Sequence, residues 1–229
     1  MPGKFVLITG AKGGLGTFVT RKFLEAGETV IGASRSIQWS DFNNMNFMPE
    51  KTDFSDEASV QHLADSAIQR FGRIDVLVHV VGGFAGGKPL HETDAQTWSQ
   101  MLDQNLTSAF HITHAIIPHM RREGRGRIIA VGSNTAKHPH ANFGAYVISK
   151  SALATLIETI ALENADRNIT ANLVLPGTMD TPGNRAAMPS VDPKQWVNPA
   201  NVANVIYWLA SNDAAQTNGA SITVSGREA

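Results

Sequence analysis

The chain has 229 residues, 42% of them hydrophobic, and a formal net charge of -1. This length and apolar content suit one globular domain with a sizeable core. The charge balance leaves no global basic field to hold nucleic acid, and a local arginine run reads as a solvated helix end and loop: Arg121, Arg122, Arg125 and Arg127. The lack of cysteine excludes disulfides, thiolate metal sites and cysteine nucleophiles.

The amino terminus reads MPGKFVLITG, a short apolar run followed at once by glycines. A signal peptide instead has a basic start, a longer apolar stretch and small residues, so none is predicted. No segment approaches the roughly 18 uninterrupted apolar residues that indicate a membrane span. We expect a soluble, cytoplasmic protein without a membrane partner.

The first part of the chain has the pattern of a strand, a glycine turn and a helix. Residues 5–8 are an apolar run, and apolar residues then recur at helical spacing over residues 15–26. Between them, Gly10, Gly14 and Gly16 let the backbone approach a pyrophosphate, whose charge the amides of the new helix favour. This segment predicts a nucleotide-binding turn.

A second predicted strand, residues 29–33, ends at Ser34 and Arg35 without an acidic residue. A nicotinamide-binding fold that prefers NAD usually places an acid here to hold the ribose 2′-hydroxyl. Arg35 can instead pair with a 2′-phosphate. The sequence therefore predicts NADP(H) as the preferred cofactor, with NAD(H) as the alternative.

The alternation of strands and helices continues through the middle of the chain. A short strand at residues 46–48 leads to Asp53 and to a helix that Ser55 caps and that runs to residue 70. Residues 74–81 are nearly all apolar, as in a strand covered on both faces. A glycine-rich turn, residues 82–87, follows this strand.

A long helix is predicted over residues 93–122. Thr93 or Asp94 would cap it, and Pro118 would bend or shorten its last turns. Asn105 lies inside this helix. The histidines at positions 111 and 114 have helix-neighbour spacing but no evident third ligand, so no metal site is predicted.

Tyr146 and Lys150 are the candidate proton-transfer pair. A strand at residues 127–132 ends at Ser133, and the helix after it runs to about residue 164. Residues four apart share a helix face, and this face packs inward. A fixed ammonium stabilises a phenolate, so we expect Lys150 to lower the pKa of Tyr146 toward neutrality.

The last part of the chain adds a strand at residues 169–175, a helix at 202–209 and a strand at 220–224. The loop at residues 178–198 contains apolar side chains that could cover a substrate. With no linker or composition break, residues 1–229 predict one α/β domain. Its fold would be a Rossmann-type doubly wound parallel sheet of about seven strands with helices on both faces.

These motifs resemble the short-chain dehydrogenase/reductase family over nearly the whole chain. Its cofactor turn matches Thr9-Gly10-x-x-x-Gly14-x-Gly16, and its adenine-side acid matches Asp53. Its four catalytic positions match Asn105, Ser133, Tyr146 and Lys150 in order and spacing, and its nicotinamide-side segment matches Pro176, Gly177 and Thr181. The chain departs from the family at His79-Val80-Val81-Gly82, where Asn-Asn-Ala-Gly is common.

The resemblance implies hydride transfer between nicotinamide and a small carbonyl or alcohol, in the manner of a carbonyl reductase or alcohol dehydrogenase. Tyr146 would be the general acid/base, Lys150 would hold the nicotinamide ribose, Ser133 would bind the substrate oxygen, and Asn105 would support a water-linked proton path. It also implies a homodimer or homotetramer that pairs through two long helices.

The expected contacts fall into two sets. The cofactor would touch Gly10, Lys12, Gly14, Leu15, Gly16, Ser34, Arg35, Asp53, Phe54, Val81, Gly82, Tyr146, Lys150, Pro176, Gly177, Met179 and Thr181. The substrate would touch Phe84, Ser133, Met179, Met188 and Trp196.

Two other functions stay open. The glycine-rich turn after Val81 and the segment from Asp180 through Trp196 resemble the dihydropteridine reductase branch, which would make the protein a pteridine reductase. That branch usually lacks the serine and favours NADH, whereas this chain has Ser133 and Arg35. The fold could also serve a non-catalytic NADPH-sensing protein, which would have little reason to keep both Tyr146 and Lys150.

Overall fold

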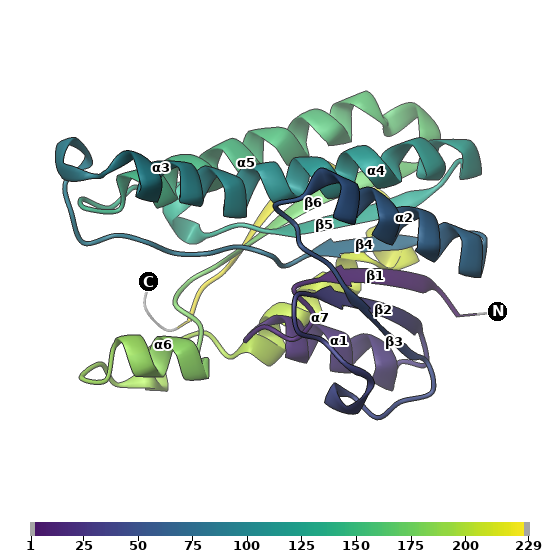
Figure 1. The fold of residues 1–229 in the computed structure, drawn as a ribbon, viewed down its shortest axis with the longest axis horizontal. Coiled ribbons are helices and arrows are strands. Elements are labelled where there is room, and N and C mark those ends of the chain that lie inside the picture. The colour runs from purple at the N-terminus through teal and green to yellow at the C-terminus, as the bar shows by residue number, and fades with distance from the viewer. Residues whose placement is uncertain (1–2, 227–229) are drawn as a thin grey trace.

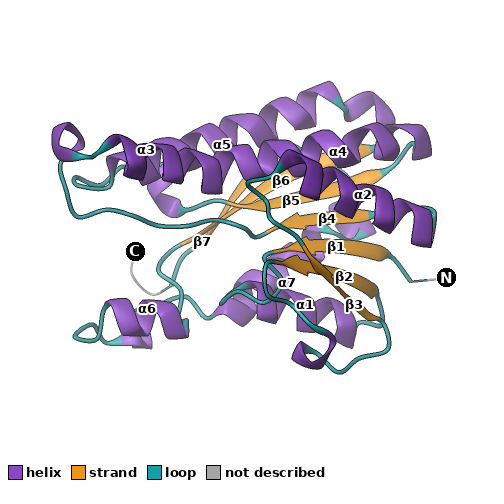
Figure 2. Ribbon diagram, in the orientation of Figure 1, coloured by secondary structure: helices purple, strands orange, loops and turns teal. Residues whose placement is uncertain are grey.

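Seven parallel strands form the centre of the molecule in the computed structural model, which describes residues 3–226 (Figures 1 and 2). The strand order is β3-β2-β1-β4-β5-β6-β7, and every neighbouring pair is parallel. The strands are β1 (Phe5–Thr9), β2 (Thr29–Ser34), β3 (Phe47–Lys51), β4 (Val76–His79), β5 (Gly126–Val131), β6 (Ile169–Pro176) and β7 (Ser221–Val224). The predicted doubly wound sheet of seven strands is confirmed.

Helices cover both faces of this sheet, so the inner strands are apolar on both sides. On one face lie α2 (Glu57–Phe71), α4 (Ser108–Glu123) and α5 (Gly144–Glu163), and on the other α1 (Gly16–Glu25) and α7 (Pro199–Leu209) (Figure 1). Each layer buries its own hydrophobic cluster against the strands. Two short helices, α3 (Ala95–Leu102) and α6 (Pro182–Ala187), project past the carboxyl ends of the strands.

The helix predicted over residues 93–122 is not continuous. Asp94 caps α3 through the Thr97 amide at 2.7 Å, and a π-helical segment, Asp103–Thr107, separates α3 from α4. Such segments add one residue to a helical turn and are common at functional sites. Pro118 lies within α4 but does not shorten it, since the helix runs on to Glu123.

Two other boundaries differ from the predictions. Asp56, and not Ser55, caps α2, because the Ser55 hydroxyl donates to the Asp53 carboxylate at 2.7 Å. Strand β3 extends to Lys51 through Pro49, which an edge strand tolerates because only one of its sides is paired.

Helix α5 is 20 residues long and apolar enough to meet the length and composition of a membrane span. Its inward side chains account for part of this apolarity, because Leu153, Ile157 and Ile160 are buried in the core against the sheet, while Ile148 and Leu162 are exposed. Helices that pack in a protein core often meet the same criterion of length and composition. Helix α5 carries both Tyr146 and Lys150.

Candidate active site

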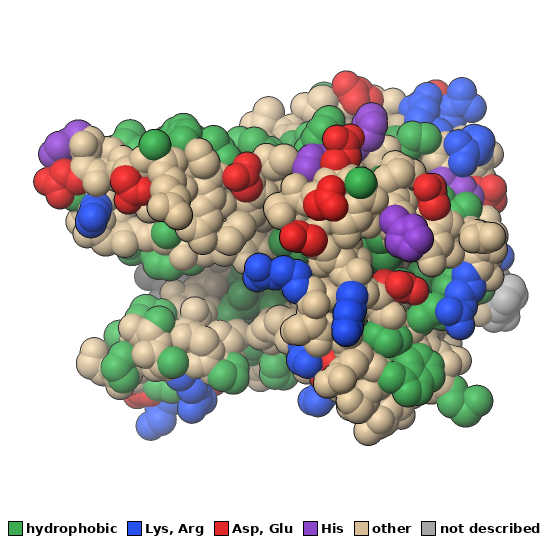
Figure 3. Space-filling view, viewed as in Figure 1, with side chains coloured by type: hydrophobic (Ala, Val, Ile, Leu, Met, Phe, Trp, Pro, Cys, Tyr) green, Lys and Arg blue, Asp and Glu red, His purple; other side chains and the backbone are tan. Residues whose placement is uncertain are grey.

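A cleft of about 1700 Å³ opens at the carboxyl ends of the strands. In Figure 3 the molecule is hollowed between the arm that carries α3 and the arm that carries α6. Ligands of open α/β sheets bind at this edge, where neighbouring strands send their helices to opposite faces. Since single-ligand pockets are typically about 300–1,000 Å³, the volume suits a dinucleotide and a second molecule together.

The glycine turn forms the floor of the cleft at the end of β1. Gly10 has a φ of +67°, and a Cβ on Gly16 would collide with the Gly10 carbonyl, so the turn requires glycine at both positions. A Cβ on Gly14 would lie 3.0 Å from the Thr181 methyl group, across the cleft from the turn. Gly14, Leu15 and Gly16 line the cleft at the start of α1, where a phosphate would need accessible backbone amides.

The end of β2 brings together the residues expected at the adenosine end. Ser34, Arg35 and Asp53 all line the cleft. The Ser34 hydroxyl oxygen is buried and has no hydrogen-bond partner, as expected of a group that a ligand completes. Hydrogen bonds from Ser55 lower the pKa of Asp53, and the Arg35 charge acts in the same direction. The donors present therefore fit a nucleotide.

Lys12 adds a second cation at this end of the cleft. Its Nζ forms an ion pair with Asp41 at 2.9 Å and donates to the Ser36 carbonyl at 3.2 Å. The hydrogen bond from Lys12 holds the pKa of Asp41 below its ordinary value. Lys12 is thus tied to the segment after β2, beside Arg35.

Tyr146 and Ser133, two of the residues that the sequence offers as catalytic candidates, lie together in the cleft. Burial raises the pKa of the Tyr146 phenol above its ordinary value, and hydrogen bonding by the Ser133 hydroxyl acts in the opposite direction. Ser133 is itself held by Thr135, whose hydroxyl donates to Ser133 Oγ at 2.9 Å. Tyr146 is therefore a protonated acid at neutral pH.

The pKa of Tyr146 is raised and not lowered, contrary to the expectation from the sequence for a phenol beside Lys150. Its Nζ donates to the Val131 carbonyl at 3.0 Å, and its side chain is only 5% exposed. This burial lowers the pKa of Lys150 itself to about 8, so it is still mostly protonated at neutral pH. Burial also disfavours the charged phenolate of Tyr146, and this is the main reason why the pKa of Tyr146 is raised.

Asn105 supports the site from beneath and does not line the cleft. It lies fully buried in the π-helical segment, where its Oδ1 accepts from the Gly83 amide at 2.9 Å and its Nδ2 donates to the Gly83 carbonyl at 3.0 Å. Nδ2 also donates to Ser149 Oγ, which in turn donates to the Tyr146 carbonyl at 2.7 Å. Asn105 thus joins the turn after β4 to the start of α5.

The substrate residues predicted from the sequence separate into two groups. Phe84, Ser133, Met179 and Met188 line the cleft. Trp196 does not, because its side chain is packed beneath the loop and only 7% exposed, while its neighbours Gln195 and Val197 face the cleft. The cofactor residues predicted from the sequence all line it.

Sequence reasoning missed part of the lining. One face of α3 and the segment after it contributes Gln96, Ser99, Gln100 and Asp103, and the approach to α5 contributes His140 and Phe143. The spacing of the first four, at i, i+3, i+4 and i+7, marks a single polar helix face that could have been found in the sequence.

Among residues 3–226, no three potential histidine or carboxylate metal ligands gather in one place.

The short chain dehydrogenase family profile matches residues 4–191. The chain belongs to this family. Among related short-chain dehydrogenases, 3beta-hydroxysteroid dehydrogenase 1 of Eggerthella lenta is 31% identical over 99% of this chain and 94% of its own. A 3-oxoacyl-(acyl-carrier-protein) reductase of Thermotoga maritima is 29% identical, with 99% and 98% covered. The solved structure of ElxO with NADP bound has a TM-score of 0.91 and 27% identity over 97% of both chains.

In this short-chain dehydrogenase, His79 takes the place where the family commonly has an asparagine. Thr9 Oγ1 accepts from the Val80 and Val81 amides, which occupies both of its lone pairs, so its own proton goes to His79 Nδ1, 3.0 Å away. The remaining ring proton on Nε2 then faces Ser108 Oγ at 3.4 Å, and that hydroxyl donates to the Gln104 carbonyl. A neutral His79 therefore braces β1 against the π-helical segment.

Acid is expected to destabilise this protein through His79. Burial, followed by the nearby Lys150 charge, lowers the pKa of His79 to about 3, against an ordinary 6.5. The unfolded chain therefore binds more protons between those values, and stability falls as pH drops below 6.5. At pH 5 this amounts to about 2 kcal/mol.

Urea unfolding at pH 7 and pH 5 measures this effect. The wild type should lose about 2 kcal/mol more between the two pH values than His79→Gln, which cannot titrate. His62→Gln, on the exposed face of α2, serves as the control and should behave as the wild type. Equal losses in wild type and His79→Gln would contradict this role of His79.

Proposed function

We propose that the protein is an NADPH-dependent reductase of small carbonyl compounds that works reversibly as an alcohol dehydrogenase. The observation that carries this proposal is the continuity of one cleft, from a phosphate-binding glycine turn to a protonated tyrosine beside a serine hydroxyl. A dinucleotide placed on the turn can reach the tyrosine without leaving this cleft.

The chain's own residues would handle the substrate oxygen. Ser133 Oγ would hydrogen-bond that oxygen and stabilise its developing negative charge. Tyr146, protonated at neutral pH, would donate its proton to the same oxygen. The bound nicotinamide would supply the hydride. Lys150 would hold the nicotinamide ribose, and Asn105 would position the turn at Gly83 and the start of α5.

The preference for NADP(H) rests on the end of β2. Arg35 and Lys12 place two cations beside the buried, unpaired hydroxyl of Ser34, where an NAD-preferring protein would have an acid. A 2′-phosphate would pair with both cations. The related ElxO was solved with NADP bound, which supports the same choice.

A panel of carbonyl compounds, offered with NADPH and with NADH, tests the proposed function. We expect substrate-dependent oxidation of NADPH, with NADH slower at equal concentration. Quinonoid dihydropterin belongs in the panel, because its exclusive reduction would replace the proposal by a pteridine reductase. Binding of NADPH without oxidation by any compound would contradict the reductase assignment and favour a sensor.

We also propose assembly as a homodimer or homotetramer through α4 and α5. Both helices leave large apolar side chains exposed on their outer faces, among them Phe110, Ile148 and Leu162. Exposed apolar surface of this kind is typical of subunit contacts.

We also propose a cytoplasmic location, in keeping with a small-molecule substrate and a nicotinamide cofactor.

A further inference from the structure

The aromatic ring of Phe84 is held inside the cleft with much of its surface uncovered. It lies 5.0 Å from the Tyr146 ring and 5.2 Å from the Phe143 ring, in both cases edge to face. Even so, Phe84 is 61% exposed. A large apolar group left open beside a catalytic side chain is typical of a binding surface for an apolar ligand.

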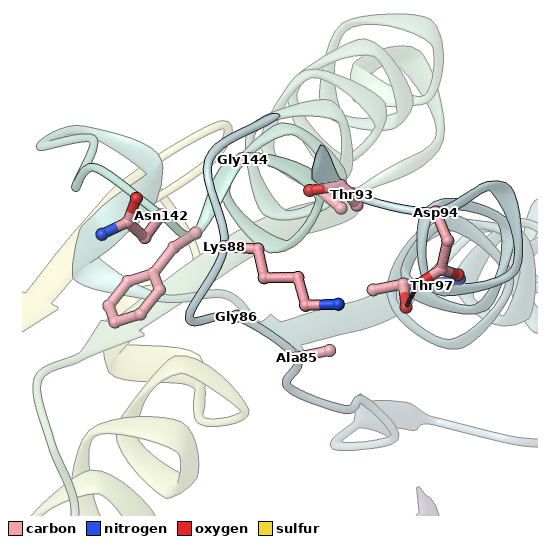
Figure 4. A pocket seen from close by; sticks show the side chains of 10 residues that line it. Ala85, Gly86, Lys88, Thr93, Asp94, Thr97, Asn142 and Gly144 are labelled. Atoms are coloured by element: carbon pink, nitrogen blue, oxygen red, sulfur yellow. Dashed lines mark hydrogen bonds between the residues drawn. The ribbon is translucent and has the colours of Figure 1, made fainter. Parts of the chain in front are cut away.

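Two anchors fix the loop that carries Phe84. On one side, the Asn105 amide makes two hydrogen bonds to the backbone of Gly83. On the other side, the Gly87 amide donates to the Asn142 carbonyl at 2.8 Å, and Gly87 takes a φ of +102° that favours glycine. Figure 4 shows this loop crossing in front of the start of α5. The ring is therefore positioned before any ligand arrives, which lowers the entropic cost of binding.

Phe143 extends the same surface. The loop packs directly on the Phe143 ring at Gly86. Only glycine allows this contact, because a Cβ at residue 86 would collide with the ring. Phe84, Phe143 and Tyr146 thus form one aromatic wall that begins at the proton donor. Aromatic rings pack on such a wall in offset or edge-to-face contacts, which add to the burial of apolar area.

The other residues that line the cleft near the aromatic wall bear on which substrate charge can bind there. Met179 and Met188 line it and can make favourable sulfur contacts with a ring. Along α3 the lining is mainly uncharged, with Gln96, Ser99 and Gln100, but it ends at the carboxylate of Asp103. An anionic substituent lying along α3 would be repelled by this carboxylate, whereas the Lys150 ammonium is engaged with the Val131 carbonyl at the end of β5.

We propose that the substrate is an uncharged aromatic carbonyl compound whose planar ring packs on Phe84 and Phe143. Its carbonyl oxygen would lie at Ser133 and Tyr146. This inference rests on the proposed function. In the reduction, the carbonyl carbon gains a hydride from NADPH, the carbonyl oxygen gains the Tyr146 proton, and solvent restores that proton. The ketone is reduced to an alcohol and the dihydronicotinamide is oxidised to NADP⁺.

Affinity for two matched ketones tests the aromatic wall. Calorimetry with the enzyme–NADP⁺ complex, which cannot turn over a ketone, compares 2-acetylnaphthalene with the saturated 2-acetyldecalin. We expect the naphthyl ketone to bind at least about fivefold more tightly, although the decalyl ketone is the more hydrophobic of the two. Equal affinities, or binding by neither compound, would overturn the inference.

Variants locate the effect within the cleft. Phe84→Leu keeps an apolar side chain but removes the ring, and it should reduce the naphthyl preference to less than about twofold, as should Phe143→Leu. Phe71→Leu is the control, because its ring packs on Phe5 at the end of α2 and does not line the cleft. A preference that survives in both cleft variants would contradict the wall assigned here.

A charged analogue tests the second part of the proposal. We expect 6-acetyl-2-naphthoate to bind at least about tenfold more weakly than 2-acetylnaphthalene, and equal or tighter binding would overturn the restriction to uncharged substrates.

Measurements of turnover distinguish a failure of this inference from a failure of the proposed function. If aliphatic ketones are reduced and bind as well as aromatic ones, only the inference fails. If the naphthyl ketone binds preferentially but no carbonyl compound oxidises NADPH, the reductase assignment fails.

Discussion

Replacing Tyr146 by phenylalanine is expected to lower kcat by about 10²–10⁴-fold, the usual contribution of general acid catalysis. The substitution removes only the hydroxyl, so the edge-to-face contact between this ring and Phe84 is kept. Affinity for NADPH should stay within about twofold, because the phosphate contacts are proposed to come from the glycine turn and the end of β2. The loss would therefore appear in the chemical step and not in cofactor binding.

Single-turnover measurement of NADPH oxidation, together with a fluorescence titration of NADPH, separates these two quantities. The chain offers a matched control, since it has only two tyrosines. Tyr207 lies on α7, where its ring packs on Phe23, and it does not line the cleft. Tyr207→Phe should keep near-normal turnover. Near-normal turnover in Tyr146→Phe would remove this tyrosine from the mechanism.

Replacing Arg35 by alanine is expected to weaken NADPH binding by about 10- to 100-fold, while NADH binding changes by less than about twofold. A hydrogen bond to a charged group contributes about 1.5–3 kcal/mol, which corresponds to this range. Only NADPH carries the 2′-phosphate, so the effect should be confined to it. Lys12 should limit the loss of affinity, because it would still face the 2′-phosphate. It also forms an ion pair with Asp41, so the phosphate and Asp41 would share its charge.

Dissociation constants for both cofactors, measured at one fixed salt concentration, give the ratio that decides this prediction. Arg167→Ala is the control, because Arg167 precedes β6 and so lies at the edge of the sheet away from the cleft. Arg35→Asp should go further and reverse the preference, since a carboxylate repels the phosphate and can hold the 2′-hydroxyl of NADH. A parallel loss for NADPH and NADH would mean that Arg35 does not read the 2′-phosphate.

The order of strands and helices could be predicted from the sequence because buried parallel strands are continuous apolar runs between glycine turns. The spacing of Tyr146 and Lys150 fixed their common helix face in the same way. The break at residues 103–107 could not be seen, since a π-helical segment has no distinct apolar period. Trp196 was misplaced because a loop sequence does not show which of its side chains turns inward.

The electrostatics of the site were the least predictable part. From spacing alone, Lys150 is simply a cation near a phenol. In the fold it is buried against the Val131 carbonyl, and the same burial raises the pKa of Tyr146. Which effect prevails depends on desolvation, and desolvation is a property of the packed structure and not of the residue order.

The π-helical segment also constrains how the length of this chain can change. Removing one residue from Asp103–Thr107 would restore a regular helix, but it would rotate α3 against α4 by about 100°. Either the polar face of α3 would then turn out of the cleft, or Asn105 would leave Gly83. Insertions and deletions in related chains should therefore be accommodated in the loop before Ala95, and the number of residues from Gln96 to Asn105 should stay constant.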